Sequence, residues 1–192
     1  MPSVSFMRLV RLVSLAMQPS LIFRFCPRCG VERSMPTSSE PFRCAPCAFL
    51  FFFNPAVAAA AILLGPDGRA LFIRRAKEPS KGMLGMAGGF IDIGETAEQA
   101  LRREVREEVN LELESLRFLC SQPNSYAYQE VTYPVLDLFF VATTLKPAEA
   151  AALDAVESFC WLDPHAVDPA ELAFPSMREA MRVFQRGQQS SF

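Results

Sequence analysis

Histidine is almost absent from this chain of 192 residues, which contains a single one, His165. A catalytic dyad or triad that uses imidazole as its base would have to be built on that residue alone. We expect His165, within the sequence Asp-Pro-His-Ala, to lie in a solvated turn. If the chain is an enzyme, carboxylate and metal chemistry is therefore the better expectation.

An excess of basic residues is also missing, because 19 Lys and Arg residues stand beside 21 Asp and Glu residues, for a net charge of -2. Chains that bind DNA or RNA usually carry a basic patch, so we do not expect nucleic acid as a partner. The chain also lacks internal repeats and long low-complexity tracts. Its 51% hydrophobic content can form one sizeable core with a small appendage, whereas two full domains would be cramped.

No apolar run is long and unbroken enough to predict a membrane span. Residues 1–22 carry only basic charges, Arg8 and Arg11, and faintly resemble a signal or transit peptide, but no convincing small-residue cleavage site follows. We expect this segment to be flexible or marginally helical, and Met17 could be the true first residue. We therefore expect a cytoplasmic protein without a membrane partner.

The apolar stretch 49–64 is interrupted by Asn54 and Pro55, and a turn sequence, Gly65-Pro66-Asp67-Gly68, leads from it into residues 70–75. This order predicts a hairpin rather than a membrane helix. Periodicity predicts the remaining elements. The expected strands are 113–120, 134–142 and 158–162, and the expected helices are 96–109 and 176–186.

Four of the six cysteines form two CxxC pairs separated by fourteen residues: Cys26 with Cys29, and Cys44 with Cys47. Each pair could supply one knuckle of a tetrahedral zinc site, and a segment with so little core of its own needs such a staple. The alternative is two disulfides. We favour structural Zn²⁺ because the rest of the chain indicates an intracellular protein, and we predict a zinc ribbon over residues 23–53.

The two remaining cysteines, Cys120 and Cys160, are expected to be buried, inert thiols. Neither belongs to a CxxC pair, so neither is expected to bind the metal.

The most acidic part of the chain lies in the expected helix 96–109. Residues three and four apart share a helix face, so Glu104, Glu107 and Glu108 would project together. Like charges ~4 Å apart repel by ~1 kcal/mol in water and by ~4 kcal/mol at an effective dielectric near 20, so the trio favours a divalent cation. Oxygen ligands of this kind suit Mg²⁺ or Mn²⁺. The alternative is a solvated helix face with ordinary ion pairs.

The opposite face of that helix would be apolar and could lie on a sheet. It carries Ala97, Leu101, Val105 and Val109.

The spacing of Gly89, Glu95, Arg103-Glu104 and Glu107-Glu108 resembles the Nudix signature GX5EX7REUXEEXGU. Asn110 stands where the signature has its last glycine, and asparagine is the next best residue for the left-handed conformation expected there. The resemblance covers about residues 55–185. It implies an α/β protein with the Nudix α/β/α sandwich and a mixed sheet, which we place at 54–188.

The resemblance also implies roles for the residues of the signature. Glu95 and Arg103 would form a structural ion pair that ties the loop to the helix. Glu104 and Glu108 would be metal ligands together with the backbone carbonyl of Gly88.

Glu107 would either bind a second ion or polarise water, according to the same resemblance. Some family members take their catalytic base from a later loop, and here Glu157 stands where that residue is often found. The alternative for Glu157 is an ordinary solvated loop glutamate.

A zinc ribbon before a Nudix domain is similar to the NADH pyrophosphatase branch and to related bacterial proteins. That branch carries an SQPWPFPxS array after the signature, and Ser121-Gln122-Pro123 begins at the matching position. The match then stops, because Asn124-Ser125-Tyr126-Ala127-Tyr128 stands where the array has Trp-Pro-Phe-Pro. These tyrosines could stack on a base, with ~1 to 3 kcal/mol each, or simply pack in a loop.

The resemblance implies a metal-dependent pyrophosphohydrolase that acts on a nucleoside diphosphate linked to another group. The leading substrate class comprises NADH or NAD, ADP-ribose and nucleotide sugars. Alternatives are a nucleoside triphosphate or damaged-nucleotide pyrophosphatase, and a Nudix module that senses nucleotides without cleaving them. A homodimer is a further expectation from the family, although no sequence feature defines its interface.

Overall fold

A computed structural model describes residues 18–33 and 41–187. The first seventeen residues of the expected N-terminal segment lie outside the described part. The chain divides into two compact units, Met1–Asn54 with Ala127–Tyr133 and Pro55–Tyr126 with Pro134–Phe192. No described helix is long and apolar enough to cross a membrane.

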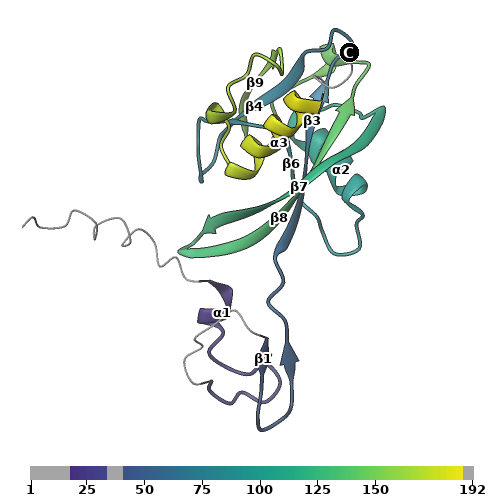
Figure 1. Cartoon of the computed structure of the whole chain (residues 1–192). Helices are drawn as coiled ribbons and strands as arrows, with labels where there is room; N and C mark the ends of the chain where they lie inside the picture. The colour runs from purple at the N-terminus through teal and green to yellow at the C-terminus, as the bar shows by residue number, and fades with distance from the viewer. Residues whose placement is uncertain (1–17, 34–40, 188–192) are drawn as a thin grey trace, which may run out of the picture. The chain divides into compact units, whose positions relative to one another are not determined.

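In residues 18–33 and 41–54, the first unit contains one short helix and a two-stranded antiparallel sheet (Figure 1). Its core consists of two cysteines and one aromatic ring, with four further side chains packed around them. So small a core cannot be expected to hold a fold without a staple. Its elements are α1 (Pro19–Ile22), β1 (Phe42–Arg43) and β2 (Leu50–Phe51).

The second unit is built on a mixed seven-stranded sheet with the order β5-β4-β3-β8-β7, in which β6 also pairs with β3 and β9 with β4, and only the ends of β7 and β8 within Ala127–Tyr133 are counted with the first unit. The strands are β3 (Ala56–Leu64), β4 (Ala70–Arg75), β5 (Leu84–Gly85), β6 (Ala87–Phe90), β7 (Ser115–Tyr128), β8 (Val131–Thr143) and β9 (Val156–Leu162). The helical elements are α2 (Ala97–Val109), η1 (Pro147–Glu149), η2 (Pro169–Glu171) and α3 (Pro175–Gly187).

The strand β3 lies in the middle of this sheet. It runs parallel to β8 from the pair Ala56 and Val135 to the pair Leu64 and Thr143. Its other edge pairs first with β6 and then with β4, and the Gly65 N–H donates to the Arg69 carbonyl at 2.9 Å to close the turn into β4. The expected hairpin is therefore confirmed.

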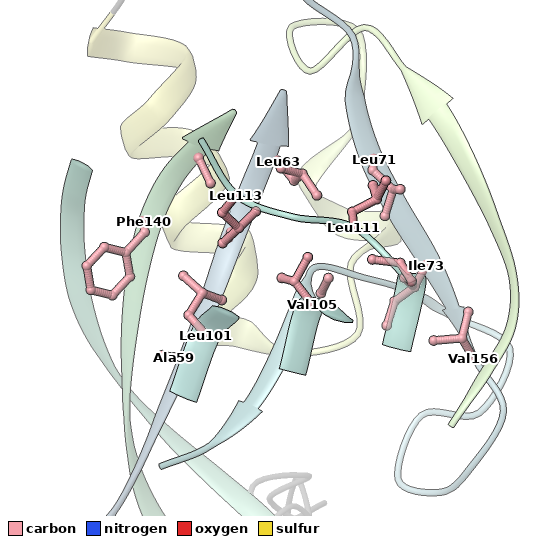
Figure 2. Packing of buried hydrophobic residues seen from close by; sticks show 14 residues of the cluster. Ala59, Leu63, Leu71, Ile73, Leu101, Val105, Leu111, Leu113, Phe140 and Val156 are labelled. Carbon is pink, nitrogen blue, oxygen red and sulfur yellow. The ribbon is translucent and has the colours of Figure 1, made fainter. Parts of the chain in front are cut away.

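The helices α2 and α3 cover opposite faces of the sheet (Figure 1). Successive strand residues point to opposite faces, and accordingly Leu63 packs in the cluster that contains Leu101 and Val105 of α2, whereas Ile62 packs in the cluster of α3. Figure 2 shows the α2 side chains among those of the strands. The expected α/β/α sandwich with a mixed sheet is confirmed.

The ends of α2 explain why the helix stops where it does. Thr96 forms a capping box with Gln99, in which the Gln99 N–H donates to Thr96 Oγ1 at 3.2 Å and the Thr96 N–H donates to Gln99 Oε1 at 2.8 Å. At the other end Asn110 adopts the left-handed conformation, with φ 58° and ψ 32°. The expectation for Asn110 is confirmed, and its side-chain Nδ2 donates to the Glu149 carbonyl at 3.0 Å.

The hairpin of β7 and β8 is longer than expected. The strand predicted over 113–120 continues to Tyr128, and the strand predicted over 134–142 begins at Val131. Both residues of the connecting turn, Gln129 and Glu130, have positive φ values of 45° and 66°. Such turns usually contain glycine or asparagine, so their position was not evident from the sequence.

The isolated thiols and the histidine occupy ordinary positions. Cys120 and Cys160 are half-buried rather than buried, since they lie at the periphery of the α3 cluster. His165 is exposed in a turn, as expected, and its N–H donates to Asp163 Oδ1 at 2.9 Å. Its ring stacks on Phe184 with the centroids 5.5 Å apart.

Candidate active site

A cavity of about 290 Å³ lies in the second unit and is lined from β3, β6, α2, β7, β8 and α3, among other segments. Its lining has two parts of different character. We call the first the acidic wall, which consists of Gly88, Gly89, Glu104 and Glu108. We call the second the aromatic wall, which consists of Phe90, Asn124, Tyr126, Asp137 and Phe174.

The acidic wall forms where α2 packs against β6. The Gly88 N–H donates to Glu108 Oε2 at 2.9 Å, so the strand backbone holds the carboxylate directly. Gly88 has a φ of 145°, and a Cβ there would lie 2.1 Å from the Ala59 carbonyl oxygen. A Cβ on Gly89 would lie 2.5 Å from the carboxyl carbon of Glu104. Gly88 is therefore required for β6 to pair closely with β3, and Gly89 for the Glu104 carboxylate to reach the strand.

Both carboxyl groups of this wall are destabilised as anions. Burial raises the pKa of Glu108 to about 8, against the opposing effect of the Gly88 N–H, and the charge of Glu104 raises it further. Burial also raises the pKa of Glu104, although its hydrogen bond from Arg103 opposes the rise. A divalent cation between these groups would remove this penalty, so the donor set fits a hard metal ion.

Arg103 connects the acidic wall to the loop before α2. Its Nε and Nη2 donate to the two carboxylate oxygens of Glu95 at 2.9 and 2.8 Å, and this bidentate pair lowers the pKa of Glu95 to about 2. The expected ion pair is present in the structure. The same guanidinium also donates from Nη1 to Glu104 Oε1 at 2.7 Å and from Nη2 to the Phe90 carbonyl at 3.1 Å. Arg103 therefore also fixes the orientation of a candidate metal ligand.

Three residues predicted for the site do not line the cavity. The side chain of Glu107 is 54% exposed, and its Oε2 lies 3.2 Å from Arg103 Nη1. Glu157 is an exposed residue of β9, and Tyr128 is an exposed residue at the end of β7. Their predicted roles as proton acceptor or stacking partner stay predictions.

Two basic residues of the lining, Arg75 and Lys77, were not singled out from the sequence. The Arg75 guanidinium carbon lies 4.8 Å from the centroid of the Phe174 ring, and its Nε donates to the Pro79 carbonyl at 2.9 Å. Lys77 Nζ lies 3.2 Å from a carboxylate oxygen of Asp154. The sequence offers one weak signal, since Arg74 and Arg75 end an apolar strand and point to opposite faces.

The aromatic wall is formed by rings from three separate segments. Tyr126 meets Phe90 edge to face, with centroids 5.5 Å apart and planes at 85°, and lies 6.2 Å from Phe174. Tyr126 lies on β7 rather than in a loop and packs against these rings, and its predicted stacking on a base stays a prediction. Asn124 and Asp137 complete the wall, and neither was predicted as a site residue.

The four paired cysteines of the first unit form a second candidate metal site. The Sγ atoms of Cys26 and Cys47 lie 3.7 Å apart, those of Cys29 and Cys44 lie 3.6 Å apart, and all four lie within 4.8 Å of one another. Four sulfurs ~2.3 Å from one Zn²⁺ in a tetrahedron would lie ~3.8 Å apart. All four are free thiols, so the alternative of two disulfides is wrong.

The backbone of the two CxxC pairs adopts the same turn twice. The Gly30 N–H donates to the Cys26 carbonyl at 2.9 Å, and the Ala48 N–H donates to the Cys44 carbonyl at 2.8 Å. Burial opposes ionisation of Cys26, but the N–H groups of Cys29 and Arg28 lower its pKa to about 7. Burial instead raises the pKa of Cys44 to about 12, so this thiol keeps its proton without a cation, and a bound metal ion would favour the thiolates.

Residues 54–184 match the family described as NUDIX domain. Among solved structures, a MutT NUDIX hydrolase from Burkholderia pseudomallei is 27% identical, with a TM-score of 0.57, and the match covers 67% of this chain and 97% of that one.

Curated relatives extend this similarity to named enzymes. The chain is 32% identical over 151 residues to the human mitochondrial NAD(P)H pyrophosphatase NUDT13, which covers 77% of this chain and 40% of the relative. It is 27% identical over 132 residues to the NAD-capped RNA hydrolase NudC of Vibrio atlanticus (strain LGP32), and this match covers 69% of this chain and 48% of the relative. The chain thus spans less than half the length of either relative.

Proposed function

The chain belongs to the Nudix family, and we propose that it is a metal-dependent pyrophosphohydrolase that cleaves the diphosphate of a nucleotide linked to another group. NADH, NAD⁺, ADP-ribose and nucleotide sugars form the proposed substrate class. The observation that supports this proposal is that one cavity combines the half-buried carboxylates of the acidic wall with the rings of the aromatic wall. Such a cavity suits a ligand with a charged diphosphate beside a flat heterocycle.

Glu104, Glu108 and the Gly88 carbonyl would hold Mg²⁺ or Mn²⁺ in this proposal. When bound, such an ion neutralises phosphate charge and lowers the pKa of the attacking water. The protein itself adds positive charge from Arg75 and Lys77, which line the same cavity. These two side chains would bind the phosphate oxygens that point away from the carboxylates.

The remaining residues position the reacting groups. Arg103 keeps Glu104 in place through their 2.7 Å hydrogen bond. Tyr126 would stack on the heterocycle. Glu107 and Glu157 are both proposed as acceptors of the proton that the attacking water releases, and replacing each by glutamine identifies which one acts. A positioned base typically accelerates turnover by ~10²- to 10⁴-fold.

The zinc ribbon is proposed as a structural module in which Cys26, Cys29, Cys44 and Cys47 bind one Zn²⁺. Four thiolates would close the coordination sphere, so substrate could not enter it. Metal analysis of the purified protein should give one zinc per chain, and replacing Cys44 by serine should remove it. Zinc that persists in this variant would contradict the site.

The proposed activity is tested by incubating the protein with NADH, NAD⁺, ADP-ribose, nucleotide sugars and nucleoside triphosphates in Mg²⁺ or Mn²⁺, with products identified by mass. Release of AMP from NADH or ADP-ribose supports the proposal. Preferential cleavage of triphosphates would support the alternative pyrophosphatase. Binding without turnover would instead support a sensing module.

One further substrate belongs in this assay because one relative is named as an NAD-capped RNA hydrolase. A short RNA with a 5′ NAD cap carries the same diphosphate as NAD⁺. Comparing the turnover of the two substrates at equal concentration shows whether the RNA beyond the cap contributes to the rate.

A further inference from the structure

We propose that Asp137 selects the substrate by accepting a hydrogen bond from an N–H group of the heterocycle at one end of the dinucleotide. This inference rests on the proposed function and adds a specificity-determining residue to it. The donor would be either the carboxamide of nicotinamide or the exocyclic amine of adenine, which present the same N–H chemistry.

Asp137 is the one ionisable carboxyl group of β8, where it lies within an otherwise apolar stretch. It is 8% exposed, and its neighbour in β3 is Ala58. Burying a carboxylate without a cation costs free energy. Among the described residues its hydrogen-bond partners are neutral, so a structural ion pair does not account for it.

The two hydrogen bonds of Asp137 end on the same oxygen. Ser176 Oγ donates to Oδ2 at 2.6 Å, and Asn124 Nδ2 donates to Oδ2 at 2.8 Å. The Ser125 N–H donates to Asn124 Oδ1 at 2.8 Å, which fixes the direction of that amide. The carboxyl group is therefore held in one orientation by donors on β7 and α3.

The second oxygen, Oδ1 of Asp137, has no hydrogen-bond partner within the described part of the chain. Every fully buried side-chain nitrogen or oxygen of the described residues does have one. Oδ1 is therefore accessible, and Asp137 lines the cavity. The result is a fixed acceptor at the edge of the aromatic wall.

The surroundings of this acceptor match a flat heterocycle. Tyr126 and Phe174 supply rings in the same wall, so a base can be stacked or enclosed while its edge reaches Oδ1. A ligand with a carbonyl or carboxylate in place of the N–H would set an acceptor against an acceptor. Sites that hydrogen-bond a substrate group reject analogues that lack it far more strongly than apolar pockets do.

Two analogue pairs test which end of the dinucleotide Asp137 reads. Nicotinic acid adenine dinucleotide replaces the carboxamide of NAD⁺ by a carboxylate, and nicotinamide hypoxanthine dinucleotide replaces the adenine amine by a carbonyl. Binding is measured by calorimetry without divalent metal, so that no turnover occurs. We expect the protein to prefer NAD⁺ over one of the two analogues by at least about tenfold.

Asp137→Asn should remove or reverse that preference. Ser176 and Asn124 both donate to one position, so they would hold the asparagine oxygen there and leave its NH₂ group facing the cavity. Ser176→Ala removes one anchor without changing the carboxyl group and should reduce the preference. It serves as the second variant if Asp137→Asn does not fold. Glu171→Gln, at an exposed position outside the cavity lining, is the matched control and should leave the preference unchanged.

Equal binding of NAD⁺ and both analogues, or an unchanged preference in Asp137→Asn, would overturn the assignment. Failure of every dinucleotide to bind would overturn it as well. A preference that depends on Asp137 without AMP release after Mg²⁺ is added would instead contradict the pyrophosphohydrolase proposal alone. AMP release without any preference would contradict the role of Asp137 alone.

Discussion

The acidic wall and the aromatic wall line one cavity but are assembled in different ways. The acidic wall comes from residues 88–108, a single stretch in which one strand, one loop and one helix follow one another. The aromatic wall gathers residues from four segments between Phe90 and Phe174, since Asn124 and Tyr126 both lie on β7. The first depends on helical spacing and the second on the topology of the sheet.

This difference separates the expected roles of the two walls. Burial raises the pKa of both carboxyl groups of the acidic wall, so their ionised forms are destabilised. The aromatic wall instead offers rings for stacking and one carboxylate oxygen fixed as a hydrogen-bond acceptor. We therefore expect substitutions in the acidic wall to reduce kcat, the turnover rate of bound substrate. Substitutions in the aromatic wall should reduce the affinity for the dinucleotide or the selectivity between dinucleotides.

The largest effect is expected for Glu108→Gln, which removes a proposed metal ligand. Its kcat should fall by ~10²- to 10⁴-fold with little change in dinucleotide binding. Steady-state kinetics with NADH in Mg²⁺ and calorimetry without metal measure the two quantities. A kcat close to that of the unchanged protein would contradict the role of the acidic wall.

A smaller loss is expected for Gly89→Ala, because the new methyl group would lie 2.5 Å from the carboxyl carbon of Glu104. The side chain can move aside, so we expect a folded protein whose kcat falls by about 10- to 100-fold. Gly88→Ala should instead impair folding, since its contact at 2.1 Å is with backbone. Thermal melts and kinetics distinguish the two, with Gly187→Ala, which meets no atom within 4 Å, as the control.

Tyr126→Ala tests the aromatic wall, because it removes a ring that is proposed to stack on the heterocycle. Loss of a stacked ring should cost ~1 to 3 kcal/mol of binding, a rise of about 5- to 150-fold in the dissociation constant of NAD⁺. The kcat should change little. Tyr126→Phe keeps the ring and should bind as the unchanged protein does. If Tyr126→Ala lowered kcat and left binding intact, the division of roles between the walls would be wrong.

Glu108→Gln should lower activity but raise the free energy of unfolding measured without metal. The folded pKa of Glu108, about 8, lies above its ordinary value of 4.5, so folding without metal takes up a proton and loses stability as the pH rises from 4.5 to 8. Glu108→Gln should therefore be more stable than the unchanged protein in chelator at pH 8, by on the order of 1–3 kcal/mol. Denaturant unfolding at pH 5 and pH 8 measures the difference, which should shrink at pH 5.

The resemblance to the Nudix signature implied the fold, the left-handed end of α2 at Asn110 and the Glu95 to Arg103 ion pair, because the residues that carry that signature lie close together in the chain. Asp137 and Asn124 could not be predicted in the same way. They lie on different strands, and only the sheet order and the length of the β7 hairpin bring them together. A lone carboxylate within an apolar strand was the available signal.

The roles that the family resemblance implies for Glu107 and Glu157 stay predictions. Their positions in the chain match the pattern, but in the structure their side chains are exposed and do not line the cavity. Spacing identifies which residues share a helix face, whereas the side chain that faces the substrate depends on contacts such as that of Arg103 with Glu107.

The most direct test of the account measures AMP release from NADH in Mg²⁺ by the unchanged protein and by Glu104→Gln, together with dinucleotide binding by both. The account predicts that both proteins bind the dinucleotide and that only the unchanged protein releases AMP at an appreciable rate. Equal rates of AMP release by the two proteins, or binding by the unchanged protein without any AMP release, would contradict it.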